Sequence, residues 1–304
     1  MDVGAPYIAI VEDLVARRLG GHVRHLDSES VPSARENRTY LKHRLETSHG
    51  HELLAFSKGG EAFRVNDRLE LFLSDVASNE FAVPNFFGCA ESDRLKIAAW
   101  VYVTGRRAKR FHQLDRADLF RVVRAVGAMN ALTDEANRQV PGIRLRDVDI
   151  LGADRVKRAL EEFDDAESRA LLPAVESYEL AVDGTRRRLS EIEVRYFSHQ
   201  DIVARNVLFD EPDRPPVFID WENTSLAVPG TCLRNFCLLD FALQQELVAH
   251  YVAFMADKGH VLNGEDILFA MGASQIQVSL RQGLKRGKIK LIRWALGAVT
   301  TYLQ

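Results

Sequence analysis

Two apolar triplets that flank a short polar loop constrain this chain more than any other feature of its sequence. The triplets cover residues 207–209 and 217–219, and the connection between them is rich in proline and aspartate. This pattern predicts an antiparallel hairpin. Because the two arms are equal in length, Asn206 and Asp220 should face each other at its open end, with Asp201 one short loop away. A carboxylate and an amide that converge in this way, with a second carboxylate close by, can hold Mg²⁺ with few protein ligands and leave phosphate oxygens and water to complete its octahedron.

The composition is that of an ordinary globular chain. Its 304 residues suggest about two domains of roughly 150 residues each. A net charge of −3 argues against a nucleic-acid or membrane-surface partner. The cysteines are odd in number and lack C-x-x-C spacing, so we expect a reducing compartment. Because there is no signal-peptide pattern and no apolar run near ~20 residues, the chain is predicted to be cytoplasmic.

Hydrophobic periodicity divides the chain into a strand-rich part and a helix-rich part. Residues 5–19 predict an amphipathic helix that ends at two glycines. Strand patterns follow at 22–26, 39–46, 51–57 and 97–103, with one helical stretch at 61–76. Later patterns are helical, at 119–132, 154–183 (two helices, because Pro173 interrupts it), 235–257 and 265–304. We therefore expect an α+β fold with two domains, 1–103 and 104–304.

His199, Asp201 and Asn206 have a spacing that suits phosphoryl transfer. Transfer to an alcohol needs a carboxylate near the attacking hydroxyl and a metal ligand near the phosphates, and one loop can present both. A helix-capping Asp with an unrelated turn Asn is the alternative, but it does not explain the hairpin that ends in Asp220. The run H-x-D-x-x-x-x-N followed by I-D-W-E resembles the catalytic motif of the aminoglycoside phosphotransferase and choline kinase superfamily.

The resemblance implies a bilobal, protein-kinase-like fold with ATP clamped between the lobes. A small antiparallel-sheet lobe with one main helix would bind the nucleotide, and a larger, mostly helical lobe would carry catalysis and the acceptor. By the same resemblance, Asp201 would be the catalytic base or would orient the acceptor hydroxyl. Asn206 and Asp220 would bind Mg²⁺, and His199 would brace the loop by hydrogen bonding.

Two charged residues beside the motif leave alternatives open. Glu222 lies two residues past Asp220, on the same face if the strand continues, where it would reach a second metal or only bond the loop. Arg205 would neutralise phosphate charge, or would form an ion pair with Asp210 or Glu222.

Lys58 is the candidate for the lysine that holds the α- and β-phosphates. It ends an apolar strand, and Glu70 lies on the helix that follows, as in the Lys–Glu pair of kinase-like folds. Lys42 on the preceding strand is the rival, and a merely solvated lysine is the third possibility. The adenine would lie against strand 97–103, with Val101 and Val103 as backbone partners, and residues 28–37 would cover the phosphates.

The chain departs from the family pattern in two places. Many members carry a further Asp that steadies the catalytic loop, and Cys232 stands where that residue would be. This puts the bracing of the loop in question but removes no catalytic group. The first lobe also lacks a G-x-G-x-x-G run.

The acceptor is expected to be a small alcohol that also carries an amine, as for many relatives. Acidic side chains of the helical part would attract such a cation, although a solvated acidic face is an equal alternative. They are Glu161, Glu162, Asp164, Asp165, Glu167, Asp240 and Glu246. Asp240 is the preferred contact because it interrupts an apolar run, where a carboxylate needs a partner; a structural Arg or Lys would also serve.

These patterns together predict an ATP- and Mg²⁺-dependent small-molecule kinase with no nucleic-acid or membrane partner. A protein kinase is the nearest rival, since D-I-V-A-R-N also resembles a tyrosine-kinase loop, but D-W-E replaces D-F-G. A nucleotide-binding regulator without turnover is the rival from another class.

Overall fold

The computed structural model describes residues 5–303, apart from 33–37, 62, 64, 77, 93–94 and 212. The chain divides into two compact units: Met1–Arg107 with Leu208–Glu222, and Ala108–Val207 with Asn223–Gln304. The domains predicted from the sequence were 1–103 and 104–304, whereas the first unit runs to Arg107 and also includes Leu208–Glu222. The hairpin strand β9 joins the first unit because Val217 pairs with Ala82 there.

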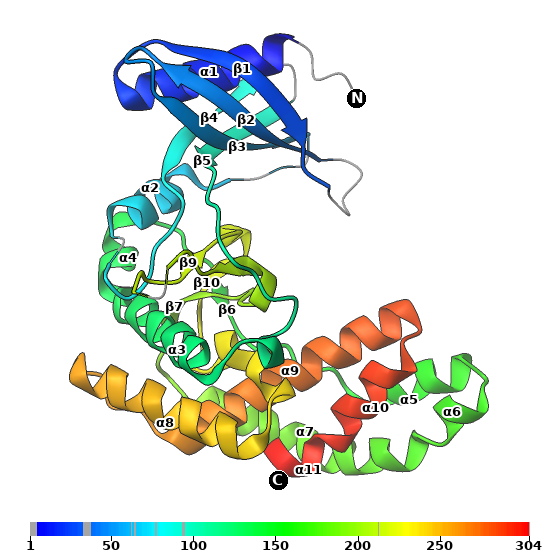
Figure 1. The fold of residues 1–304 in the computed structure, drawn as a ribbon. Coiled ribbons are helices and arrows are strands. Elements are labelled where there is room, and N and C mark those ends of the chain that lie inside the picture. The colour runs from blue at the N-terminus through cyan, green and yellow to red at the C-terminus, as the bar shows by residue number, and fades with distance from the viewer. Residues whose placement is uncertain are drawn as a thin grey trace. The chain divides into compact units, whose positions relative to one another are not determined.

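The first unit is built on an antiparallel sheet of five strands in the order β1-β2-β3-β5-β4 (Figure 1). The strands are β1 (Val23–Ser30), β2 (Thr39–Thr47), β3 (Glu52–Gly60), β4 (Phe86–Ser92) and β5 (Leu95–Val101). Strand β4 was not predicted from the sequence. Its register shifts between Phe86 and Gly88, and Gly88 has a φ of 143°, so the irregular backbone breaks the alternation that identifies a strand.

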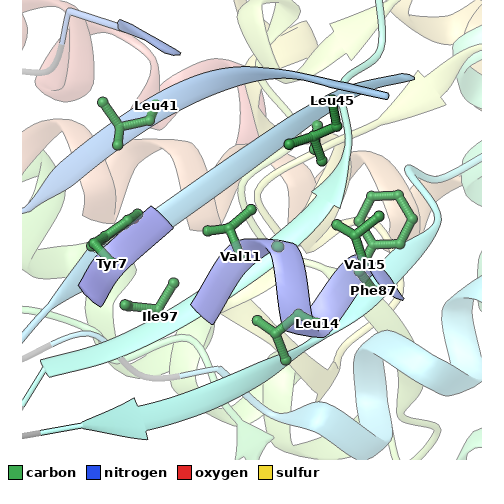
Figure 2. Packing of buried hydrophobic residues seen from close by; sticks show 10 residues of the cluster. Tyr7, Val11, Leu14, Val15, Leu41, Leu45, Phe87 and Ile97 are labelled. Carbon is green, nitrogen blue, oxygen red and sulfur yellow. The ribbon is translucent and has the colours of Figure 1, made fainter. Parts of the chain in front are cut away.

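Helix α1 (Ala5–Leu19) covers one face of this sheet, as predicted for residues 5–19. Its buried residues Tyr7, Val11, Leu14 and Val15 recur at helical spacing and therefore form one apolar stripe. Figure 2 shows this stripe against Leu41, Leu45, Phe87 and Ile97 of the sheet. Burial of each large side chain contributes about 1.5–3 kcal/mol, so this stripe holds the helix on the sheet.

Helix α2 (Asp67–Asp75) is shorter than the predicted helical stretch of 61–76. It begins at Asn66, whose side chain accepts a hydrogen bond from the backbone N–H of Leu69. An Asn cap satisfies one of the free N–H groups at a helix start, which explains the later beginning. Helix α2 carries Glu70 on the first turn.

The second unit is mainly helical, as its apolar patterns predicted. Its helices are α3 (Arg116–Ala131), α4 (Thr133–Gln139), α5 (Ala153–Glu162), α6 (Ala166–Arg169), α7 (Leu172–Glu191), α8 (Phe241–Asp257), α9 (Gly264–Arg286), α10 (Ile289–Gly297) and α11 (Val299–Tyr302). The stretch 154–183 was predicted to hold two helices but holds parts of three, because Asp165 caps the short α6 between the others. None of the described helices is both long enough and apolar enough to cross a membrane.

A small three-stranded sheet in the second unit carries the predicted catalytic loop. Its order is β6 (Leu145–Arg146), β10 (Thr224–Ala227) and β7 (Tyr196–His199). A buried polar network anchors β7. Asn130 of α3 donates to the carbonyl of Phe197 at 2.7 Å and accepts from the hydroxyl of Tyr251 on α8 at 2.7 Å. Strand β7 therefore ends at a fixed position, and the predicted catalytic loop begins there.

The predicted hairpin is present as a two-stranded sheet of β8 (Val207–Leu208) and β9 (Val217–Phe218). Backbone bonds tie it to the first unit, since Arg106 and Phe209 exchange two bonds of 2.8 and 3.0 Å. Asn206 directly precedes β8, and Asp220 follows β9 after one residue. The closeness of Asn206 to Asp220 stays a prediction.

Candidate active site

The loop after β7 is closed by its own side chains. His199 is fully buried, and its Nδ1 accepts from the backbone N–H of Asp201 at 3.1 Å. Asn206 lies in the 3₁₀ helix η2 (Ala204–Asn206) and donates from Nδ2 to the carbonyl oxygen of Asp201 at 2.9 Å. By contrast, the side chain of Asp201 is 25% exposed. The loop thus holds its own backbone and leaves the Asp201 carboxylate accessible.

A second layer of contacts braces this loop from η4 (Thr231–Leu238), the segment that carries Cys232. Nε2 of Gln200 donates to the hydroxyl oxygen of Thr231 at 3.3 Å, and Nδ2 of Asn235 donates to the carbonyl oxygen of Ile202 at 2.7 Å. Cys232 is fully buried, and burial raises the pKa of its thiol to about 11. Thr231 and Asn235, on either side of Cys232, therefore brace the loop. Neither residue was predicted from the sequence, because they carry no motif.

In the first unit, Lys58 joins the two carboxylates that follow the hairpin. Its Nζ donates to Oδ1 of Asp220 at 2.9 Å and also to Glu222. Arg38 donates to both oxygens of Glu222, at 2.7 and 2.9 Å. Burial opposes ionisation of Glu222, but Arg38 and Lys58 outweigh it and hold the pKa of that carboxyl below its ordinary value.

The ion pair predicted between Lys58 and Glu70 is not formed in this structure. Glu70 instead accepts from the indole Nε1 of Trp100 at 3.0 Å. Burial raises the pKa of Glu70 to about 7, which outweighs the opposing influence of Trp100 and Lys58. Lys58 instead forms hydrogen bonds to the carboxylates of Asp220 and Glu222, which lie more than 160 residues away in the sequence.

The rival Lys42 lies outside this cluster. Its Nζ is 3.4 Å from Glu29 and lies 5.0 Å from the ring centre of Tyr102, and its side chain is 27% exposed. The side chain of Lys58 is 9% exposed. The local geometry therefore favours Lys58 as the nucleotide lysine.

Lys58→Met should weaken ATP binding about ten- to hundredfold, the usual range for losing a hydrogen bond to a charged group. Lys42→Met should change the affinity by less than about fivefold, because exposed pairs contribute little. Methionine keeps most of the apolar stem in both variants. Isothermal titration with ATP checks the pair; a larger effect at Lys42 would transfer the nucleotide role to that residue.

Asp220 adopts a left-handed backbone with a φ of 67°. Asp tolerates this region better than most residues, but the conformation is still strained. The turn is held by Trp221, which is buried and donates from Nε1 to the carbonyl of Phe218 at 3.0 Å. Strained backbone that its surroundings enforce is common at functional sites.

Two of the three predicted Mg²⁺ ligands each keep an oxygen that a metal could use, and their role stays a prediction. Asp220 offers a carboxylate with only Oδ1 engaged by Lys58, and Asn206 offers its amide oxygen because Nδ2 is used within the loop. Glu222 fits less well, since Arg38 and Lys58 already bind it. Among the described residues, no group of three or more His, Cys, Asp or Glu is placed to hold a metal ion.

The structure gives the remaining predicted nucleotide and phosphate residues different surroundings. The N–H of Val101 donates to the carbonyl of Asn85 at 2.8 Å, so it is not available to adenine. Val103 follows β5 and has no backbone bond to a described residue. Residues 33–37 of the predicted phosphate-covering turn lie outside the described residues.

The side chain of Arg205 is exposed. Both carboxylates predicted as its alternative partners pair with other cations: Asp210 pairs with Arg214, and Glu222 pairs with Arg38 and Lys58.

The acidic residues predicted to attract a cation mostly have structural partners. Asp240 is exposed and caps α8 by accepting from the N–H groups of Ala242 and Leu243, so a helix end supplies the partner it needs. The others with partners are Asp164 (Arg169), Asp165 (the α6 cap), Glu167 (Arg293) and Glu246 (Arg116). A role of Asp240 in acceptor binding stays a prediction.

Glu70→Gln should make the protein more stable above pH 7. The folded state holds the Glu70 proton up to about pH 7, whereas the ordinary carboxyl loses it near 4.5. The folded state thus binds more protons in this window, so stability falls as pH rises through it. Removing this penalty is expected to contribute about 3 kcal/mol at pH 8 and almost nothing at pH 4. Urea unfolding at both values checks this; an equal effect at both would mean that Glu70 is ionised throughout.

The fold and these side chains define a class of protein. An antiparallel sheet with a buried lysine, joined to a helical unit with an Asp–Asn loop, is the arrangement of a kinase-like phosphotransferase. The model of the phosphotransferase enzyme family matches residues 28–254, and the chain belongs to this family. It is an ATP-dependent small-molecule kinase.

Solved structures share the fold at low sequence identity. A spectinomycin phosphotransferase in complex with ADP and spectinomycin is 13% identical, with a TM-score of 0.60 over 100% of this chain and 96% of that one. An aminoglycoside phosphotransferase bound to ADP and hygromycin B is 14% identical, with a TM-score of 0.54 over 96% and 97%. Choline kinase from Cryptosporidium parvum is 13% identical, with a TM-score of 0.54 over 91% and 88%. Comparison with curated protein sequences finds no match.

Proposed function

We propose that this kinase moves the γ-phosphoryl group of ATP to a hydroxyl of a small polar molecule in a Mg²⁺-dependent reaction. The observation that carries the proposal is the loop at Asp201. Its backbone is held by His199 and Asn206, while its carboxylate stays exposed enough to meet an acceptor. A carboxylate fixed in this way suits the task of orienting a hydroxyl.

In the proposed reaction the acceptor hydroxyl oxygen forms a bond to the γ-phosphorus. The bond from that phosphorus to the bridging oxygen breaks, and its electron pair leaves with ADP. The hydroxyl proton passes to the carboxylate of Asp201, which then releases it to solvent. His199 keeps the loop in place, and Arg205, which is exposed beside Asn206, offers charge to the phosphates.

Lys58 and Asp220 are proposed to serve the nucleotide together. In the structure, Lys58 binds Asp220 and Glu222, which keeps its ammonium at the carboxylate that the metal would need. We expect the phosphates to take over Lys58, since its ammonium is a natural phosphate ligand. Asp220 and Asn206 would then hold Mg²⁺, which neutralises phosphate charge when bound. Glu222 would stay with Arg38 and fix the turn.

The acceptor is proposed to carry an amine beside the hydroxyl, on the resemblance to aminoglycoside and choline kinases. ADP release is to be measured with amino alcohols, with neutral sugars and nucleosides of similar size, and with a protein substrate. Turnover of amino alcohols that falls as salt rises supports the proposal. Turnover of only the neutral compounds without a salt effect would contradict the cationic acceptor. Turnover of only the protein would favour the protein-kinase alternative.

A further inference from the structure

Arg234 of η4 is a buried cation beside the catalytic carboxylate. Its side chain is 10% exposed, and its Nη2 lies 3.6 Å from Oδ1 of Asp201. Its Nε is buried and has no hydrogen-bond partner among the described residues. No role was predicted from the sequence for this residue, which stands 33 positions after Asp201.

The negative charge of the Asp201 carboxylate offsets part of the free-energy cost of burying the Arg234 guanidinium. Burial lowers the pKa of this guanidinium, Asp201 opposes that effect, and the nearby Arg146 adds to it. Asp201 is its ion-pair partner in the described part of the chain. A buried cation is costly unless it is paired, so the position of Arg234 is tied to the negative charge on Asp201.

The segment that carries Arg234 is fixed to the rest of the second unit. It starts at Gly230, whose φ of 90° and close approach to the carbonyl of Ile267 leave no room for a side chain. The ring of Phe236 stacks on Phe111 with centroids 4.4 Å apart. Asn235 binds the backbone of the catalytic loop at Ile202. Arg234 is therefore presented to Asp201 from a rigid base.

The Asp201 carboxylate lies between two neighbours, one at each oxygen. Arg234 faces Oδ1 at 3.6 Å, and Nδ2 of Asn206 lies 3.4 Å from Oδ2. Both contacts are long, so each oxygen keeps lone pairs for an acceptor hydroxyl. The unpartnered Nε of Arg234 is the second donor that a bidentate contact with the same carboxylate would use.

We propose that Arg234 is a positioning residue that orients the carboxylate of Asp201 toward the acceptor. The inference rests on the proposed function, and it concerns how this chain holds the carboxylate of its base. Arg234 acts through Asp201, so its removal slows the chemical step and leaves ATP binding in place. A purely structural residue would affect both through misfolding.

The test is a double-mutant cycle on ATP hydrolysis, with Mg·ATP as the probe and water as the acceptor. Arg234→Met should lower kcat about a hundredfold, the scale of a misplaced catalytic group, with KM for ATP within about twofold. Arg234→Lys keeps the charge without the planar fork and should recover about tenfold of that loss. In an Asp201→Asn background, Arg234→Met should add little, because both changes act on one group. The matched control is Arg138→Met at an exposed arginine of α4, which should keep the wild-type rate.

Thermal unfolding and ATP affinity are measured on each variant. If Arg234→Met does not fold, the comparison uses Arg234→Lys, which should still lose kcat with normal affinity. Wild-type kcat in a folded Arg234 variant would overturn the inference, as would independent effects of Asp201→Asn and Arg234→Met that multiply. A wild-type protein that binds no ATP and releases no ADP would instead overturn the proposed function, and this inference with it.

Discussion

Asp201→Asn should abolish phosphoryl transfer while ATP–Mg²⁺ binding stays nearly intact. The carboxylate would take the acceptor proton, and an amide of the same shape cannot, so a loss of about 10²–10⁴-fold in kcat is expected. The backbone of Asp201 should keep its place, because the bonds from His199 and Asn206 use its N–H and its carbonyl oxygen. Turnover and calorimetric ATP affinity of the variant are the measurements.

Folding needs a control in this variant, since it leaves the buried Arg234 without its anionic partner. Loss of one member of a buried pair costs up to about 3–5 kcal/mol, and less where the partner is partly exposed. Circular dichroism and the unfolding midpoint provide that control. A folded Asp201→Asn protein that has lost its nucleotide affinity would identify Asp201 as a metal ligand and contradict the roles assigned above.

Asp220→Asn should remove the Mg²⁺-dependent part of ATP binding. Asn tolerates the left-handed backbone at this position, with its φ of 67°, so it is a cleaner change than Ala. The loss of the carboxylate charge is expected to weaken ATP binding in the presence of Mg²⁺ by at least about tenfold, and to change little without it. Titration of ATP with and without Mg²⁺ checks this.

Asp210→Asn is the matched control, because this exposed carboxylate lies on the same hairpin and pairs with Arg214. It should keep the wild-type response to Mg²⁺. Wild-type Mg²⁺ dependence in Asp220→Asn would show that the open end of the hairpin holds no metal.

The sequence predicted the parts of this fold whose patterns are local. The stripe on α1 repeats over enough residues to be identified. The β8–β9 hairpin was predicted from the two apolar triplets that flank a loop rich in proline and aspartate. Strands β6 and β10 are two and four residues long, too short for a periodic pattern, so they were missed. The loop at Asp201 was found because its residues are close in sequence.

Tertiary partners account for the predictions that did not hold. Lys58 and Glu70 were paired because they lie close along the chain, but the fold brings Asp220 and Glu222 to Lys58 and Trp100 to Glu70. A role for Arg234 could not be predicted, because that role depends on the burial of its side chain beside Asp201. The capping role of Asp240 could have been predicted, since an Asp directly before a long apolar helix is a typical N-cap.

The γ-phosphoryl group of ATP should end on a hydroxyl of a small molecule, and transfer of a label on that group is the most direct measurement. The chain is incubated with Mg²⁺, ATP labelled at the γ-phosphorus, and the acceptor panel, and the products are separated by mass. We expect a labelled phosphate ester of a small acceptor, which is formed together with an equal amount of ADP and is absent when the Asp201→Asn variant is used. Label found only on added protein, or ATP bound but never consumed with any acceptor, would contradict it.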